Sequence, residues 1–166
     1  MSVGELPLVT IVTPTYNNAD YLCETIESVL SQTYQNIEYI VINDGSTDNT
    51  REVLEKYKHK CTIIHQENTG QSETLNRGWT MAKGKILGYI SSDDRLKLDC
   101  VASAVDILEN NGTVVATYCD FDLIDASGKR VRPVVTEEFD VKRLTEDLVC
   151  QPGPGAFFRT EAFIEV

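Results

Sequence analysis

The chain has 166 residues, of which 42% are hydrophobic and 25% are charged, and 15 basic against 26 acidic side chains give it a net charge of −11. A chain of this length can bury enough surface to form one domain with its own core, which excludes a largely disordered protein. The acidic balance, with no basic run, excludes nucleic-acid binding, because that binding depends on Lys and Arg contacts to phosphates.

Two further observations concern the compartment of the protein. The sequence contains no run approaching the roughly 18 apolar residues of a membrane span, and the first ten residues lack the pattern of a secretory signal. We therefore expect a cytoplasmic protein. The cysteines are odd in number and never form a CxxC pair, so we expect buried free thiols rather than disulfides or a thiolate zinc site. They are Cys23, Cys61, Cys100, Cys119 and Cys150.

Short apolar runs rich in β-branched residues alternate with segments of helical periodicity. This pattern is typical of an α/β fold in which helices flank a mostly parallel sheet. The predicted strands are 8–13, 37–42, 61–65, 86–90 and 114–124. The first predicted helix is capped by Asn18 or Asp20, the second follows Asp48, the third stops at Gly84, and the fourth covers about 99–110. On the third helix, Trp79 lies on the apolar stripe and is expected in the core.

The remainder is less regular. Residues 126–129 indicate a turn, 141–149 a short helix and 151–155 an irregular loop, and the sequence stops in what resembles the opening of another helix. Because domains rarely end inside an amphipathic segment, we expect a truncated chain.

Three polar segments, 13–18, 43–46 and 91–94, directly follow predicted strands. In open α/β sheets, ligands bind beyond the carboxyl ends of the strands. The adjacent carboxylates of Asp93 and Asp94 repel each other, so the pair suggests a divalent ion, Mg²⁺ or Mn²⁺, shared with a diphosphate. The alternative is that the pair caps a helix and needs no ligand.

The other polar candidates also have two interpretations. Asp44 either contacts a nucleobase or ribose, or caps the helix that follows it. Tyr16 packs against a base or against a neighbouring helix. Arg77 and Lys83 either neutralise phosphate or lie on solvated helix faces. Phosphate-loop, dinucleotide, nucleophile-elbow and zinc-protease motifs are absent from the sequence.

In their order along the chain, several segments resemble the family 2 glycosyltransferases, whose nucleotide-sugar-binding domain has the GT-A fold. They are VTIVTPTYN (9–17), SVLSQTY (28–34), VINDGSTD (41–48), QENTGQS (66–72), AKGK (82–85), SSDD (91–94) and FFRTEAF (157–163). The resemblance implies one GT-A domain over 1–166. Within it, 1–125 would be the nucleotide-binding core and 126–166 the start of an acceptor-side region.

The resemblance also implies roles for individual residues. The nucleotide would be bound by Thr13, Pro14, Tyr16, Asp44, Gln71, Arg77 and Asp93. Of these, the first three would wall the base, Asp44 would contact the base or ribose, and Gln71 and Arg77 would lie beside the phosphates. Asp93 would ligate Mn²⁺ or Mg²⁺.

Two features depart from the family pattern. Ser91 replaces the first carboxylate of the usual Asp-x-Asp-Asp metal motif. The family's catalytic base is a carboxylate located beyond the FFRTEAF stretch. Glu146 and Asp147 form a Glu-Asp pair, the residue types that often carry this base, but they precede that stretch. We therefore expect the base beyond Val166.

The function that the resemblance implies is an inverting, metal-dependent glycosyltransferase. It would move a sugar from a nucleoside diphosphate donor, most often UDP, to a saccharide or lipid-linked acceptor at the inner face of a membrane. The alternative is a noncatalytic module that keeps the fold and binds a nucleotide sugar. A phosphoacceptor or phosphatase-like domain using Asp44 or Asp93 is a third, less favoured hypothesis.

Overall fold

The main sheet of the computed structural model, which describes residues 6–146 and 154–164, contains six strands in the order β3-β2-β1-β4-β8-β5. The strands are β1 (Val9–Thr15), β2 (Ile37–Asp44), β3 (Thr62–Gln66), β4 (Ile86–Tyr89), β5 (Ala116–Thr117) and β8 (Phe157–Arg159). Strands β1 to β4 pair with one another in parallel, and β8 runs antiparallel to both β4 and β5. The predicted α/β fold with a mostly parallel sheet is confirmed.

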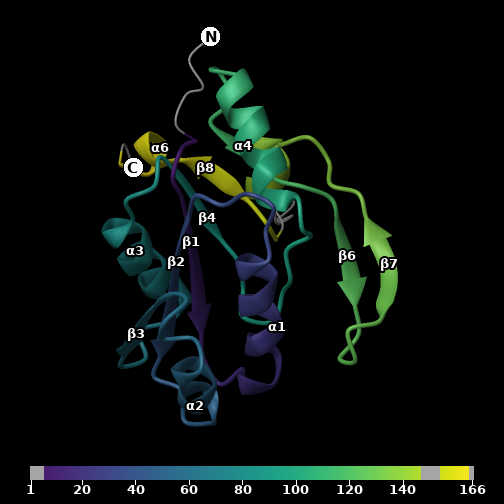
Figure 1. Cartoon of the computed structure of the whole chain (residues 1–166). Coiled ribbons are helices and arrows are strands. Elements are labelled where there is room, and N and C mark those ends of the chain that lie inside the picture. Colours follow the sequence, from purple (N-terminus) through teal and green to yellow (C-terminus); the bar gives the residue numbers. More distant parts are fainter. Residues whose placement is uncertain (1–5, 147–153, 165–166) are drawn as a thin grey trace.

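Helices cover both faces of this sheet (Figure 1). The helices of the described residues are α1 (Ala19–Leu30), α2 (Thr50–Glu55), α3 (Gln71–Met81), α4 (Cys100–Asn110), α5 (Val141–Thr145) and α6 (Thr160–Ile164). Alternation along β1 separates the two faces: Val9 and Ile11 pack with α1, α2 and α4, whereas Val12 packs with α3. Within the described residues, none of the helices is long and apolar enough to cross a bilayer.

Helix α3 lies directly against β1. A Cβ built on Gly78 would be only 2.5 Å from Cγ1 of Val12, so a larger residue would not fit at this contact. Trp79 is half-buried on the same face and contacts three aromatic rings edge-on, those of Tyr89, Phe158 and Phe163. The tryptophan predicted to be in the core therefore joins α3 to the sheet.

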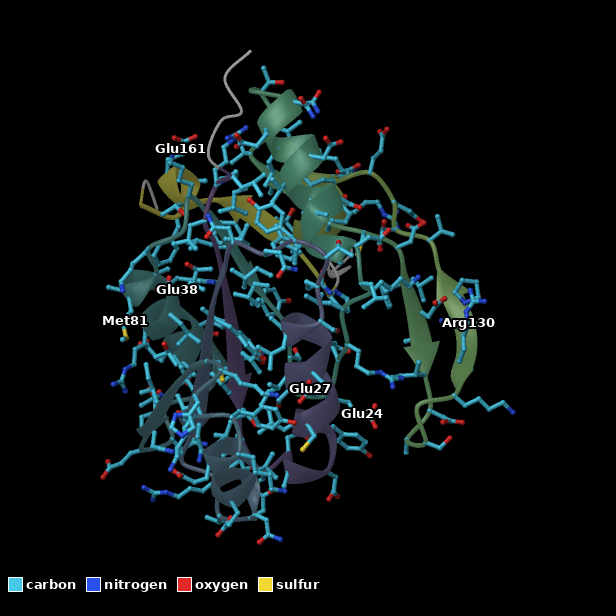
Figure 2. The ribbon with its side chains drawn as sticks, in the orientation of Figure 1. Glu24, Glu27, Glu38, Met81, Arg130 and Glu161 are labelled. Atoms are coloured by element: carbon cyan, nitrogen blue, oxygen red, sulfur yellow. The ribbon has the colours of Figure 1, made fainter. Side chains whose placement is uncertain are left out.

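Glu38 on β2 fixes the connection from α3 to β4 (Figure 2). Its Oε2 accepts hydrogen bonds from Thr10 Oγ1 at 2.6 Å and from Lys83 N at 2.8 Å. The Thr10 hydroxyl oxygen in turn accepts a bond from Gly84 N at 2.9 Å. These contacts fix the start of β4. They thereby also fix the position of the segment 91–94, which follows the carboxyl end of this short strand.

The prediction of one strand at 114–124 is wrong. The structure has the short β5 in the main sheet, and then β6 (Phe121–Ile124), which pairs with β7 (Arg130–Val134) in a separate hairpin (Figure 1). Asp120 lies at the break, and its Oδ1 accepts bonds from Thr136 N and Oγ1, both at 2.9 Å. These bonds hold the chain to the hairpin instead of the sheet.

The other predictions for this part have mixed outcomes. The predicted turn at 126–129 is confirmed as the hairpin turn, in which Asp125 Oδ1 accepts bonds from Ser127 N and Lys129 N. The predicted helix at 141–149 begins at Val141 as expected and is α5. Its predicted positions 147–149, Cys150 and most of the predicted loop 151–155 lie outside the described residues.

Candidate functional site

Strand order places the polar segments at one edge of the sheet. From β1 the chain moves to β2 and β3, and then returns to β4 on the other side of β1. The loops that follow β1 and β4 thus leave in different directions at a topological switch point, which is where open α/β sheets bind ligands. The loop that follows β2 reaches the same edge, because β1, β2 and β4 are parallel.

Two asparagines connect these three loops. Asn17, at φ 51°, accepts a hydrogen bond at its Oδ1 from Thr47 N at 2.7 Å. Of the two predicted caps of α1, Asn18 and Asp20, Asn18 occupies the N-cap position. Its side chain makes no capping bond, however, and its Nδ2 donates to Ser92 Oγ at 2.8 Å. The side chain of Asp48 takes over the capping role, because its Oδ2 accepts a hydrogen bond from Ala19 N, the first backbone N–H group of α1. The loop after β1 is therefore tied to the loops after β2 and β4.

Asp44, at the end of β2, is only 3% exposed and organises the loop before α3. Its Oδ1 accepts bonds from Gln66 Nε2 at 2.7 Å and Thr69 N at 2.9 Å, and its Oδ2 accepts one from Gly70 N at 2.9 Å. Burial alone would raise the pKa of this carboxyl. The hydrogen bonds from Gln66, Thr69, Gly70 and Thr74 outweigh burial, so the pKa lies below its usual value.

Neither interpretation of Asp44 from the sequence anticipated this arrangement. Asp44 does not cap α2, because Asn49 occupies the N-cap position and Asp48 Oδ1 accepts the bond from Thr50 N. Both Asp44 oxygens are occupied by the loop 66–70. Any contact of Asp44 with a base or ribose remains a prediction, and its contacts with the protein make it a positioning residue.

The same loop positions Arg77 on α3. Gln66 Oε1 accepts a bond from Arg77 Nη1 at 2.7 Å, while Gln66 Nε2 binds Asp44. Among the described residues Arg77 has no ion-pair partner, so its charge remains available to an anion. Gln71, the first residue of the same helix, is also exposed.

The end of β1 presents one exposed candidate and two buried ones. Thr13 is fully buried, and its hydroxyl shares a 3.0 Å hydrogen bond with the Tyr39 hydroxyl. Pro14 is buried too, whereas Tyr16 is 51% exposed and is the side chain of this group that a ligand can reach. Sequence reasoning missed Thr15, whose buried Oγ1 has no hydrogen-bond partner in the described part of the chain. Thr15 could have been found from the sequence, because it lies between two candidate residues, Pro14 and Tyr16.

Asp93 follows β4 in a turn, and its side chain is exposed. It makes no hydrogen bond or ion pair with any other described residue. The alternative that the pair caps a helix is wrong, because α4 begins at Cys100 and Asp99 is its N-cap residue. The Asp94 carboxyl is partly buried beside Asp93, and burial together with that neighbouring charge raises its pKa. A cation near the pair would relieve this repulsion.

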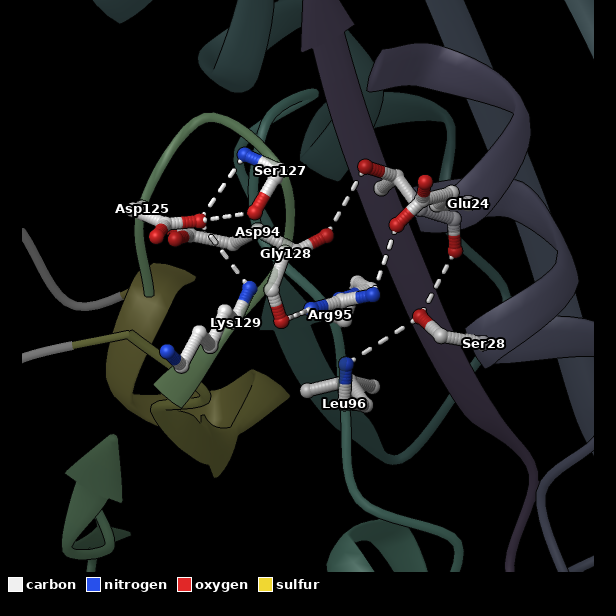
Figure 3. A network of polar contacts seen from close by, with 10 residues as sticks. Glu24, Ser28, Asp94, Arg95, Leu96, Asp125, Ser127, Gly128 and Lys129 are labelled. Carbon is white, nitrogen blue, oxygen red and sulfur yellow. Dashed lines mark hydrogen bonds and ion pairs between the residues drawn. The ribbon is translucent and has the colours of Figure 1, made fainter. Parts of the chain in front are cut away.

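The segment after Asp93 is anchored on both sides (Figure 3). Arg95 Nη1 pairs with Glu24 on α1 at 2.6 Å, and Arg95 Nη2 donates to the Gly128 carbonyl in the hairpin turn at 3.1 Å. Ser28 on α1 accepts a bond from Leu96 N at 3.1 Å. Arg95 thus connects the loop of the aspartate pair to both α1 and the β6–β7 hairpin.

Two cavities meet at this loop. The larger, of about 720 Å³, lies between α1, α4 and the segment 117–124, and the smaller, of about 230 Å³, lies beside the hairpin turn. Asp93, Arg95 and Ile124 line both cavities. The exposed Asp93 therefore borders space that a ligand can fill.

The donor set restricts how a metal could bind. The described residues contain no group of three or more His, Cys, Asp or Glu side chains that could hold an ion. Asp93 offers an exposed carboxylate with no partner among the described residues, and Mg²⁺ or Mn²⁺ would complete its shell with water and diphosphate oxygens. The residues fit a metal that is shared with an anionic ligand, not one enclosed by the protein.

Comparison with known proteins identifies the family. The sequence pattern of Glycosyl transferase family 2 matches residues 10–166, which is nearly the whole chain. The chain belongs to this family. An uncharacterized glycosyltransferase of Rickettsia prowazekii is 41% identical to this family member over 122 residues, which are 72% of this chain and 38% of that protein.

Two solved structures share the fold. The mannosyltransferase PcManGT from Pyrobaculum calidifontis, in complex with GDP-Man and Mn²⁺, has a TM-score of 0.62 and 28% identity, and the match covers 70% of this chain and 36% of that one. TarS from S. aureus, in complex with UDP-GlcNAc, has a TM-score of 0.75 and 21% identity, and the match covers 95% of this chain and 47% of that one. The expected GT-A fold is confirmed, and this family member spans less than half of each of these proteins.

Proposed function

We propose that the chain is the nucleotide-sugar-binding part of an inverting, metal-dependent glycosyltransferase. It moves a hexosyl or N-acetylhexosaminyl group from a nucleoside diphosphate, UDP above all, to a saccharide or lipid-linked acceptor. The observation that carries the proposal is the exposed Asp93 carboxylate, which has no partner among the described residues and lies where two cavities meet. The nucleotide sugars bound to PcManGT and TarS support it.

Each residue at this edge has a role in the proposal. Asp93 ligates the metal, which, when bound, neutralises the charge that develops on the departing nucleoside diphosphate. Arg77, held by Gln66, adds a positive charge near the phosphates. The exposed ring of Tyr16 contacts the base, with Thr13 and Pro14 behind it, and Asp44 keeps the loop before Gln71 in place.

Inversion requires a base on the face of the sugar opposite the leaving group, where it takes the proton of the attacking acceptor hydroxyl. We assign this role to a carboxylate beyond Val166. The proposal places the protein in the cytoplasm, at the inner face of a membrane where surface polysaccharides are built. The competing hypothesis, a noncatalytic module, differs in lacking transfer even in the full-length protein.

Calorimetric titration with UDP-, GDP- and dTDP-sugars, with and without Mn²⁺, tests the site. We expect Mn²⁺-dependent binding of at least one donor, and a loss of about tenfold or more in affinity for Asp93→Asn, which keeps the shape and removes the charge. Asp106→Asn on α4 is the matched control, because Asp106 is exposed and its side chain bonds only Asn110 among the residues that the structure describes. Metal-independent binding, or equal affinities for the two variants, would contradict the proposal.

A further inference from the structure

Two cysteine thiols lie together on the wall of the larger cavity. Cys100 is the first residue of α4, and Cys119 follows β5. A Cβ built on Gly155 would lie 3.5 Å from Cys100 Sγ and 3.4 Å from Cys119 Sγ, so both sulfurs border one small space. Cys119 Sγ donates a hydrogen bond to the Pro154 carbonyl at 3.9 Å.

The two thiols differ in exposure and acidity. Cys119 is exposed and Cys100 is half-buried. Interaction with the neighbouring Cys100 thiol, assisted by the charge of Lys97, lowers the pKa of Cys119 to about 7. The same interaction, together with burial, holds the pKa of Cys100 far above its usual value. One accessible, acidic thiol beside a second, less acidic one is the arrangement found in redox-sensing pairs.

The sequence led us to expect buried free thiols, and this expectation is only partly confirmed. The four cysteines in the described residues are free, but Cys119 is exposed and none of the four is fully buried. The break after β5 is the reason, because the chain leaves the main sheet at this point. The two thiols that meet beside Gly155 are 19 positions apart, a spacing that no local motif records.

We propose that Cys100 and Cys119 form a reversible disulfide, with Cys119 as the attacking thiol and a small-molecule disulfide such as oxidised glutathione as the oxidant. The Cys119 thiolate attacks one sulfur of the oxidant, and one glutathione leaves as a thiolate. Cys100 then loses its proton to solvent and attacks Cys119 Sγ, which releases the second glutathione. Two protein thiols are oxidised, and one glutathione disulfide is reduced to two glutathione thiols.

The crosslink would join the start of α4 to the segment between β5 and β6. Both ends line the cavity that Asp93 also lines. Oxidation would therefore fix one wall of the space beside the proposed metal ligand. This consequence rests on the proposed function, whereas formation of the disulfide does not.

Peptide mapping of the full chain tests the disulfide. The protein, with Cys150→Ser in all variants, is incubated with glutathione disulfide, quenched with acid and alkylated. We expect a Cys100–Cys119 crosslink that dithiothreitol reverses, while Cys23 and Cys61 stay alkylated thiols. Cys100→Ser should instead accumulate glutathione on Cys119, and Cys23→Ser is the matched control that leaves the crosslink unchanged. Glutathione that stays on Cys119 with Cys100 present, or crosslinks to other cysteines, would overturn the proposal.

A second measurement does not depend on how the oxidised protein folds. The rate of alkylation of Cys119 by iodoacetamide should have a midpoint near pH 7 with Cys100 present, and the midpoint should rise toward the ordinary thiol value in Cys100→Ser. An unchanged midpoint would show that Cys100 does not activate Cys119. Neither experiment contains nucleotide or metal, so both are independent of the proposed function. For the cavity, we expect at least a threefold change in donor affinity on oxidation, and an unchanged affinity would refute that consequence alone.

Discussion

Replacement of Asp44 with asparagine measures how firmly the loop 66–70 is held. Whichever way the amide is turned, its NH₂ group faces a donor that Asp44 now accepts, either Gly70 N or Gln66 Nε2 and Thr69 N. If the NH₂ group of the new asparagine faces Gly70 N, the protein loses one charge-assisted hydrogen bond of about 1.5–3 kcal/mol. The hydrogen bonds from Gln66 and Thr69 then go to a neutral acceptor and weaken. Because water can reach the exposed Gly70, we expect a loss of about 2 kcal/mol in the free energy of unfolding at pH 7.

Urea unfolding followed by the fluorescence of Trp79, the single tryptophan, gives this free energy, with Asp106→Asn as the control. The pH dependence has a defined sign. Since the folded-state pKa of Asp44 lies below the usual 3.8, its carboxylate stabilises the fold above that pH, and the stabilisation is lost as pH falls through the lower, folded-state pKa. The difference between wild type and Asp44→Asn should shrink over that window. A difference under about 0.5 kcal/mol at pH 7, or one that does not shrink in acid, would refute the reasoning.

Three further substitutions test other contacts. Gly78→Ala should lower the free energy of unfolding by about 1–3 kcal/mol, because the new methyl overlaps Val12 at 2.5 Å; a thermal melt without a lower midpoint would contradict this. Arg95→Gln should cost less than about 1 kcal/mol, since its pairing with Glu24 is at the surface, yet speed limited proteolysis at 125–129; unchanged cleavage would show that the hairpin turn is not anchored there. Thr15→Val should leave stability unchanged or raise it by up to about 1 kcal/mol in urea, and a clear loss would reveal a partner for its hydroxyl.

The first half of the fold could be predicted because its signals are local. Strands buried on both faces read as continuous apolar runs, and β1, β2 and β4 overlap the predicted segments closely. Strand β8 could not be predicted. It has three residues, too few for a periodic pattern, and its pairing partners, Ile86 to Gly88 and Ala116 to Thr117, lie far away in the sequence. The prediction of one strand at 114–124 was wrong for the same reason. The segment divides into β5 and β6 because Asp120 accepts a hydrogen bond from Thr136, which is distant in the sequence.

The site shows the same division between local and distant information. Polar residues at the ends of strands marked Asp44 and Asp93 as candidates, because strand ends can be located in the sequence. The partners of Asp44 could not be foreseen, since two of them are backbone N–H groups of Thr69 and Gly70, which any residue but proline carries. The bond from Asn18 to Ser92 spans 74 positions and likewise leaves no trace in a local pattern.

The attachment of β5 constrains the order in which the molecule assembles. In the described sheet, β5 is hydrogen-bonded to β8 alone, and β8 leaves the ribosome after the other described strands. The parallel ladder of β1 to β4 can close once residue 89 has been synthesised, but Ala116 and Thr117 must wait for Phe157 and Phe158. Strand β8 thus completes the attachment of β5 to the sheet, and a nascent chain halted before β8 would carry a complete parallel ladder beside an unfinished cavity.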